Sequence, residues 1–256
     1  MKKLTVIKIG GKLLDDEKAW KIAMDDFSKI EGVKILVHGG GKMASEICSK
    51  LGIETKMIEG RRITDSDALD VATMVYAGLL NKKLVSYLQS RGDNAMGFSG
   101  ADGNLVLSDK RPVGEIDFGW VGDVKTINTS LLTSLLTQGV TPVFCAITHN
   151  GQGQLLNTNA DTIASVLAAS LAKKYQTTLK FCFEKNGVLQ DPLDDASVLK
   201  KLSKVSYLQQ KKEGIISAGM IPKIDNALAA KQALVHQVMI CGVEGIHQLK
   251  GTEICG

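Results

Sequence analysis

Two short apolar runs near the N-terminus each end in consecutive glycines, and this feature restricts the fold more than any other. The first run is "VIKIGG", which ends at Gly11, and the second is "ILVHGGGKMA", which contains Gly39, Gly40 and Gly41. A stretch with helical periodicity follows each run, so each pattern predicts a strand, a glycine turn and a helix. Backbone amides at the N-terminus of a helix bind anions when no side chain covers them. We therefore expect an α/β protein that binds an anionic ligand at its strand ends.

Apolar strands and periodic helices continue to alternate along the chain, which is typical of βαβ units around a mainly parallel sheet. We expect a helix over residues 15–30 with Asp15 as its N-cap, and a long helix or two joined helices over residues 64–92. Residues 94–126 are rich in glycine and lack a helical period, so they predict hairpins and loops at the rim of a site. No linker separates these parts, and we expect two lobes that share one continuous sheet.

The composition narrows the class of protein. Hydrophobic residues make up 44% and charged residues 23% of the 256 residues, as in an ordered globular chain. The net charge is +4, but the lysines are spread out and aromatic residues make up only 5%, which does not favour nucleic-acid binding. The five cysteines are scattered and include no Cys-x-x-Cys pair, which favours a reducing cytoplasm over a disulfide framework or a zinc site.

A membrane segment is not expected. The sequence contains no run of about 18 apolar residues, the length that a spanning helix needs. The apolar stretch at the N-terminus is broken by Lys8 and Lys12, and no small-residue cleavage site follows it. We therefore expect a protein without a signal peptide or a membrane anchor.

The glycine triplet is compatible with more than one phosphate-binding device. It is not a P-loop, because Met43 stands where Ser or Thr should follow Lys42, and Leu36 stands where the first glycine belongs. Gly39-x-Gly41-x-x-Ala44 does satisfy the spacing of a dinucleotide-binding turn between a strand and a helix. Such a turn also needs an acidic residue about 20 residues further on. Glu59 lies near that distance, but "GRRIT" follows it instead of another strand and helix. The glycine triplet alone does not decide which kind of phosphate-binding turn this is.

Three charged residues elsewhere bear on the chemistry. Lys8 lies inside the first apolar strand, where a buried ammonium is costly unless something negative meets it. Lys223 follows a glycine-containing loop, and Pro222 before it suits a turn or the first residue of the next helix. Asp161 stands near the start of a periodic helix that Asn159 can cap. Each residue alone has an ordinary structural explanation, but the set favours a site for a negatively charged reactant.

Five segments together are similar to the amino-acid kinase family, in the order and spacing of that family. The segments are "IKIGGKLL", "VHGGG", "GRRIT" followed by a long helix, "NTNAD" and "GMIPK", and the resemblance covers almost the whole chain. It implies a three-layer αβα sandwich around a mainly parallel central sheet, with a carbamate kinase-like fold. It also implies two lobes, residues 1–172 for acyl-amino-acid binding and dimerisation and residues 173–256 for ATP binding. The implied reaction, in arginine biosynthesis, is ATP-dependent phosphorylation of the side-chain carboxylate of N-acetyl-L-glutamate.

The resemblance also implies roles for individual residues. Lys8 and Lys223 would neutralise the phosphoryl group during its transfer, and Asp161 would hold these lysines in place. The acyl amino acid would bind to Gly40, Gly41, Arg62, Asn157 and Asn159. The nucleotide would bind to Gly10, Gly11, Glu184, Lys185, Asn186, Gly187, Val188, Leu189, Ile215, Ile216 and Ser217. Mg²⁺ would be bound through the nucleotide phosphates, without ligands from the protein.

Several alternatives remain within and beyond this family. Arg61 doubles the arginine on the substrate side and Lys56 is near it, so N-succinyl-L-glutamate is a possible substrate. Other family members that share the glycine turns are another alternative, and a non-catalytic nucleotide-binding protein is a more distant one. Only seven residues precede Lys8. Because arginine-inhibited members of the family carry an N-terminal helical extension, we expect a homodimer that arginine does not inhibit.

Overall fold

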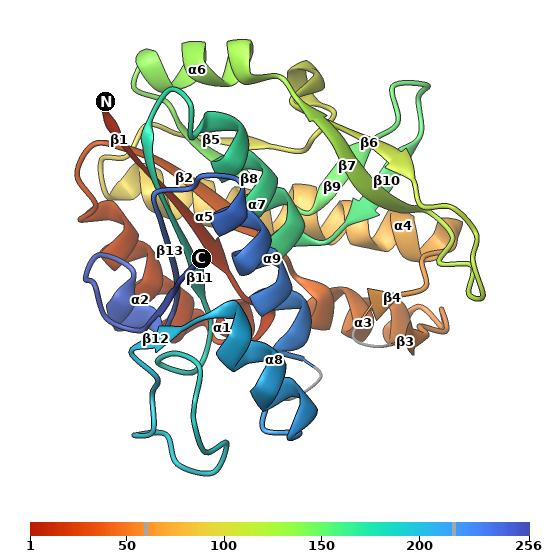
Figure 1. The fold of residues 1–256 in the computed structure, drawn as a ribbon. Coiled ribbons are helices and arrows are strands. Elements are labelled where there is room, and N and C mark those ends of the chain that lie inside the picture. The colour runs from red at the N-terminus through yellow and green to blue at the C-terminus, as the bar shows by residue number, and fades with distance from the viewer. Residues whose placement is uncertain (59–60, 217–218) are drawn as a thin grey trace. The chain divides into compact units, whose positions relative to one another are not determined.

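The computed structural model describes residues 1–58, 61–216 and 219–256, and its elements alternate between strands and helices (Figure 1). The chain forms two compact units. The first contains Met1–Lys34 and Ala164–Gly256, and the second contains Ile35–Ile163. The expected α/β fold with a mainly parallel sheet is confirmed.

The sheet of the first unit has the strand order β12, β14, β13, β11, β1. Its strands are β1 (Lys3–Ile9), β11 (Gln176–Cys182), β12 (Lys201–Leu202), β13 (Gln237–Cys241) and β14 (Thr252–Ile254). β1 runs parallel to β11 along its whole length, and β13 runs parallel to β11 on the other side. Among the described strand pairs of this unit, β13 and β14 are the antiparallel pair. The carboxyl ends of three neighbouring strands therefore meet at one edge, after Ile9, Cys182 and Cys241.

Helices complete the first unit. They are α1 (Gly11–Asp15), α2 (Glu17–Ser28), α8 (Lys204–Lys212), α9 (Ile221–Gln232), the 3₁₀ turn η3 (Val243–Gly245) and most of α7 (Ala160–Leu171). The expected N-cap of the second helix is wrong by one residue. Asp15 ends α1, and Asp16 caps α2 by accepting hydrogen bonds from the backbone amides of Lys18 and Ala19. An Asp-Asp pair gave no basis in the sequence for choosing between the two.

The second unit contains a parallel sheet and a small barrel. The parallel sheet has the order β2 (Val33–His38), β8 (Thr141–Phe144) and β5 (Ala95–Phe98). The barrel is formed by β6 (Val106–Lys110), β7 (Val121–Ile127), β9 (Ile147–His149) and β10 (Leu155–Thr158). The remaining elements are α3 (Gly41–Lys50), β3 (Met57–Ile58), β4 (Arg61–Arg62), α4 (Ser66–Thr73), η1 (Met74–Leu80), α5 (Asn81–Ser90), the 3₁₀ turn η2 (Asp102–Asn104) and α6 (Thr129–Thr137). The glycine-rich middle of the chain thus forms strands, as expected.

The long helix predicted over residues 64–92 is present as α4, η1 and α5 in succession. Asp65 caps its start by accepting a hydrogen bond from the amide of Ala68. The central segment η1 is a π-helix, which the sequence did not predict. π-helical segments occur mostly inside α-helices and frequently at functional sites.

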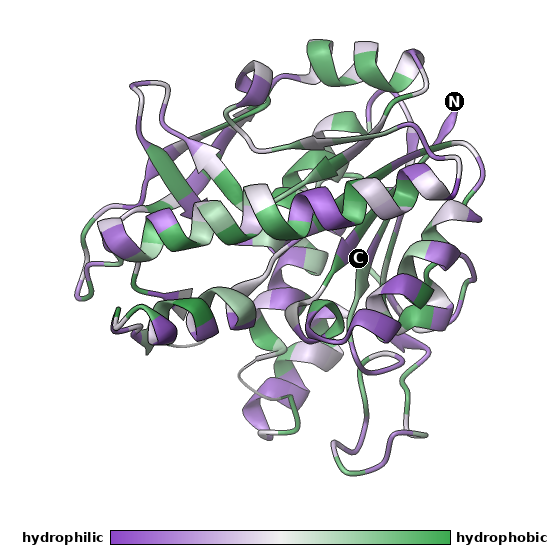
Figure 2. Cartoon of the chain, turned by 180° about the vertical axis from the view of Figure 1, so that it is seen from behind, coloured by the Kyte–Doolittle hydropathy of each residue, from purple (hydrophilic) through white to green (hydrophobic). Residues whose placement is uncertain are grey.

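The core explains why the strands are almost uniformly apolar. In β1, Leu4, Val6, Ile7 and Ile9 are all fully buried, so side chains on both faces of the strand are covered. Figure 2 shows the corresponding green stripes on the helices, with hydrophilic residues on their other faces. Strands covered on both faces have continuous apolar runs instead of alternation. None of the helices in the described ranges is both long and apolar enough to cross a membrane.

The compact units do not follow the expected lobe boundary at residue 172. Met1–Lys34 belongs to the same unit as Ala164–Gly256, because every residue of β1 from Lys3 to Ile9 pairs with β11. The expected lobes were defined by the ligands that they bind, and that division stays a prediction.

Candidate active site

The glycine turn after β2 exposes backbone donors in the second unit. Gly40 has φ of 156°, a conformation that L side chains rarely adopt, and α3 begins at Gly41 without a side-chain cap. Among the described residues, none accepts a hydrogen bond from the backbone amide of Gly40. The amide of Gly40, directly before α3, is therefore a donor that could bind an anion.

We expect Gly40→Ala to lower kcat/KM by about 10-fold and to lower the melting temperature, because the backbone strain and the added carbon both displace the turn. A Cβ at this position would lie 2.4 Å from Cδ1 of Leu80 and 2.9 Å from Cδ1 of Tyr76. Gly114→Ala is the matched control, since a Cβ there meets no atom within 4 Å. Steady-state kinetics and thermal unfolding of both variants check this, and equal activities would contradict it.

Arg62 lies against this turn. Its Nη2 donates to the backbone oxygen of Gly41 and to Oγ of Ser45, both at 2.7 Å. The side chain is 7% exposed, yet its Nη1 is buried and has no hydrogen-bond partner among the described residues. A buried guanidinium with an unused donor is costly unless a ligand provides the acceptor. The geometry therefore favours an anionic group beside the start of α3.

Asn157 belongs to the same network as Arg62. Its Nδ2 donates to Oγ1 of Thr64 at 3.0 Å, and the hydroxyl of Thr64 donates to the backbone oxygen of Arg62 at 3.3 Å. Three of the residues expected to bind the acyl amino acid, Gly41, Arg62 and Asn157, are thus joined by hydrogen bonds. They come from α3, β4 and β10, which lie far apart in the sequence.

Asn159 and Asp161 lie at the start of α7. Oδ1 of Asn159 accepts hydrogen bonds from the amides of Asp161 and Thr162, at 2.8 and 3.1 Å. The capping role expected for Asn159 is therefore confirmed. Asp161 is 8% exposed, and a carboxylate this buried needs a positive or hydrogen-bonding partner to stay ionised.

Lys8, near the end of β1, and Lys223, in α9, are both buried in the first unit. Lys8 pairs with Phe181 across β1 and β11. Lys223 lies in the first turn of α9, and Pro222 before it is the second residue of this helix. Its Nζ lies 5.8 Å from the ring centre of Phe181 and 5.5 Å from that of Phe183.

The pKa of the Cys182 thiol also reports on these lysines. It is raised by a hydrogen bond with the thiol of Cys241 and by burial, while the nearby positive charges of Lys223 and Lys8 lower it. Both ammonium groups therefore act on the end of β11. The amide of Gly10 donates to the backbone oxygen of Cys182 at 2.8 Å, which fixes the first glycine turn at the same place.

The segment expected to bind the nucleotide follows β11. Glu184 forms an ion pair with Lys12 at 3.2 Å, and Lys185 forms one with Asp195 at 2.5 Å. The amide of Val188 donates to Oγ1 of Thr252 at 2.9 Å, which holds the segment against β14. Of the second expected segment, Ile215 and Ile216 are described, whereas Ser217 lies outside the described residues. The nucleotide contacts stay a prediction.

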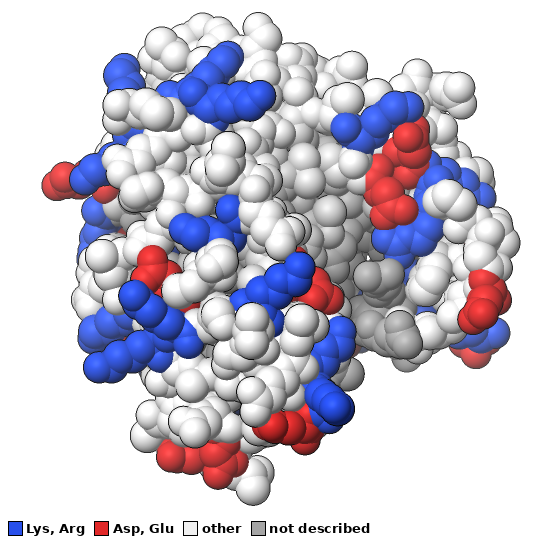
Figure 3. Space-filling view, in the orientation of Figure 1, with Lys and Arg blue, Asp and Glu red and all other residues white. Residues whose placement is uncertain are grey.

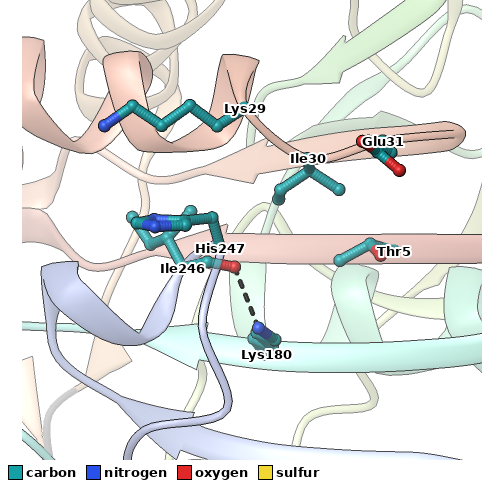
Figure 4. A pocket seen from close by; sticks show the side chains of 7 residues that line it. All are labelled: Thr5, Lys29, Ile30, Glu31, Lys180, Ile246 and His247. Atoms are coloured by element: carbon teal, nitrogen blue, oxygen red, sulfur yellow. Dashed lines mark hydrogen bonds between the residues drawn. The ribbon is translucent and has the colours of Figure 1, made fainter.

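A cavity of about 300 Å³ in the first unit is not this site (Figure 4). It is lined by Thr5, Lys29, Ile30, Glu31, Lys180, Ile246 and His247. Nζ of Lys180 donates to the backbone oxygens of Gly245, Ile246 and Gln248, so the ammonium group of Lys180 already has acceptors from the protein. Thr5 lies in the first half of β1, away from the glycine turn that ends this strand.

The charges on the surface do not form one basic stripe on the face shown in Figure 3, where acidic and basic side chains are interspersed. Within residues 1–58, 61–216 and 219–256, no three His, Cys, Asp or Glu side chains are grouped to hold a metal ion.

The sequence did not predict the residues that hydrogen-bond to the expected substrate-binding residues. Ser45 follows Gly41 by one helical turn, which is the only sign in the sequence that it could reach the same group. Thr64 follows Arg62 by two residues, so both face the same side of an extended chain. No local pattern indicates the link between Asn157 and Thr64.

The fold is that of an α/β protein with a mainly parallel sheet, and its sequence matches the pattern of the amino acid kinase family over residues 3–242. The chain belongs to this family, which confirms the resemblance drawn from the five segments. It is 52% identical to the acetylglutamate kinase of Parabacteroides distasonis, over 99% of this chain and 100% of that protein.

Solved structures show the same fold. The crystal structure of smu.665 from Streptococcus mutans UA159 is 28% identical, covers 98% of each chain and superposes with a TM-score of 0.78. Carbamate kinase from Giardia lamblia bound to AMP-PNP covers 98% of this chain and 97% of that chain, with a TM-score of 0.72. Its identity of 15% supports a common fold alone.

Proposed function

We propose that this chain transfers the γ-phosphoryl group of ATP to the side-chain carboxylate of N-acetyl-L-glutamate, in the biosynthesis of arginine. The observation that carries the proposal is the buried, unused Nη1 of Arg62 beside the free amides of the second glycine turn. This arrangement fits a small anionic acceptor. The similarity to acetylglutamate kinases along the whole chain supports this acceptor in particular.

The chemistry needs charge compensation more than acid–base catalysis. The attacking carboxylate has a pKa of about 4.3, so it is ionised at neutral pH and no general base is required. An anion must approach a polyphosphate, and the transferred group spreads charge over its equatorial oxygens. Buried lysines and fixed amides suit this task because they act in a site with little water.

Each group then has a role in the proposal. Lys8 and Lys223 stabilise the transferred phosphoryl group, and Asp161 orients these lysines. Arg62 and Asn157 bind the α-carboxylate and the acyl group, with Asn159 next to them. Gly40 and Gly41 donate their amides between the two reactants. The nucleotide binds to the first glycine turn and to the segments after β11 and α8.

In this proposal, Mg²⁺ would be held through the nucleotide, as the resemblance to the family implies. It would be bound by the β- and γ-phosphates and by water, and it would neutralise charge that develops between them.

The test is a coupled assay that follows ADP release with N-acetyl-L-glutamate, N-succinyl-L-glutamate and free L-glutamate as acceptors. We expect the highest kcat/KM with N-acetyl-L-glutamate and the lowest with free glutamate, because free glutamate carries a positive charge where the acyl amide should bind. A preference for N-succinyl-L-glutamate would show that the acyl group is succinyl, with the same phosphorylation reaction. Equal use of free glutamate would contradict both versions.

We further propose a homodimer in the cytoplasm. The long helix exposes Met74 and Leu79, which supports a second copy as its partner. The five cysteines are free thiols, as in a reducing compartment. Light scattering on the purified protein tests the dimer, and a monomeric mass would contradict it.

A further inference from the structure

The side chain of His38, the last residue of β2, is fully buried directly before the second glycine turn. Its Nδ1 lies 2.8 Å from the backbone oxygen of Gly39. A carbonyl oxygen can only accept a hydrogen bond, so Nδ1 must carry the proton of this bond. Burial lowers the pKa of His38 to about 4, and the ring is therefore neutral at neutral pH.

Asn81 fixes the other nitrogen of the ring. Its Nδ2 lies 2.9 Å from the backbone oxygen of Val143 and 3.1 Å from Nε2 of His38. The carbonyl of Val143 requires that the amide nitrogen, and not the amide oxygen, occupies this position. The same nitrogen then donates to Nε2 of His38, which must be unprotonated. The hydrogen bonds thus select the Nδ1–H tautomer without ambiguity.

The bond from His38 determines the direction of the next amide. A trans peptide is planar, and its N–H points opposite to its C=O. Because the carbonyl of Gly39 points at the ring of His38, the amide of Gly40 points away from it. That amide has no acceptor among the described residues, and it belongs to the turn that faces Arg62.

The surrounding residues leave this arrangement little freedom. Leu80 and Tyr76 lie directly against Gly40, and Asn81 follows them on the same long helix. A Cβ at Gly97 would lie 1.8 Å from Oδ1 of Asn81, so only glycine leaves room for this side chain. The π-helix η1 ends at Leu80, where it brings these residues to the turn and to the histidine.

We propose that His38 and Asn81 are positioning residues for phosphoryl transfer, in which Asn81 fixes the tautomer of His38 and His38 aims the Gly40 amide at the bound anion. This inference rests on the proposed function for the identity of the anion. It assigns to a buried histidine a task that involves neither proton transfer nor contact with a reactant.

The first experiment measures the tautomer in the free enzyme by ¹⁵N-detected NMR of histidine-labelled protein. The chain has four histidines, and the signals lost in His38→Asn identify those of His38. We expect a protonated Nδ1 and an unprotonated Nε2 at neutral pH. A protonated Nε2 would overturn the proposal. This measurement needs no substrate, so it stands even if the chain does not phosphorylate N-acetyl-L-glutamate and the proposed function fails.

The second experiment compares His38→Asn with His38→Gln. Asparagine carries its amide nitrogen at the same distance from the backbone as Nδ1, whereas glutamine carries it at the distance of Nε2. We expect His38→Gln to lower kcat by about 10-fold to 100-fold, and His38→Asn to keep kcat within about 3-fold of the wild type, with the KM for ATP unchanged in both.

Circular dichroism and thermal unfolding show whether each variant is folded, and kcat is expressed per folded molecule. A merely structural role would lower the melting temperature of both variants and leave kcat equal between them. Equal kcat values in two folded variants would therefore overturn the positioning role. If both variants unfold, Asn81→Leu decides instead, because it removes the donor to Nε2. We expect the NMR signals of this variant to show both tautomers, and an unchanged single tautomer would overturn the proposal.

Discussion

Replacing Lys8 with methionine is expected to lower kcat by about 10²-fold to 10³-fold, the usual loss when one fixed positive donor is removed from a developing oxyanion. Methionine keeps the length and volume of the side chain, so the apolar packing of β1 is preserved. The KM for N-acetyl-L-glutamate should change little, because Lys8 is proposed to act on the phosphoryl group and Arg62 on the acceptor. Steady-state kinetics with each substrate varied in turn give both constants.

Lys42→Met is the matched control for this experiment. Lys42 follows the glycine triplet directly and resembles the lysine of a P-loop, but it lies on the exposed face of α3, 3.8 Å from Glu46. We expect its loss to change kcat by less than about 3-fold, as for most surface substitutions. A larger effect of Lys42→Met than of Lys8→Met would indicate that Lys42 is the catalytic lysine, and it would contradict the assignment of Lys8.

The sequence was sufficient to predict the elements whose causes are local. A strand followed by glycines, a helix capped by an aspartate or an asparagine, and a proline in the first turn all depend on residues within a few positions of one another. Asn159 was placed correctly for this reason. The error at Asp15 has the same origin, since two neighbouring aspartates are equal by local rules and the second is the cap in the structure.

The residues that support the site could not be predicted, because their partners are distant in the chain. His38 and Asn81 are separated by 43 positions, and Asn157 and Thr64 by 93. No periodicity links such pairs, and only the folded chain brings them together. The π-helix is a similar case, since its i→i+5 bonds leave no mark in the spacing of apolar residues.

Arg62→Ala is expected to raise the KM for N-acetyl-L-glutamate by about 100-fold, which corresponds to about 2.8 kcal/mol of lost binding, and to leave the KM for ATP unchanged. The buried Nη1 has no acceptor among the residues that the structure describes, so a bound carboxylate would complete its hydrogen bonds. Charge-assisted bonds of this kind are roughly twice as strong as neutral ones. Product formation at varied acceptor concentration measures the effect.

Arg62→Lys should not restore the affinity, because lysine cannot bind Gly41, Ser45 and a carboxylate with the fixed fork of a guanidinium. Ser45→Ala should have a smaller effect, since it removes only one of the bonds that hold Arg62 in place. Arg91→Ala is the control: this arginine is exposed at the end of α5 and stacks on Tyr87. If Arg62→Ala and Arg91→Ala have the same KM for the acceptor, then the anion does not bind at Nη1, and the free amides of the glycine turn serve another group.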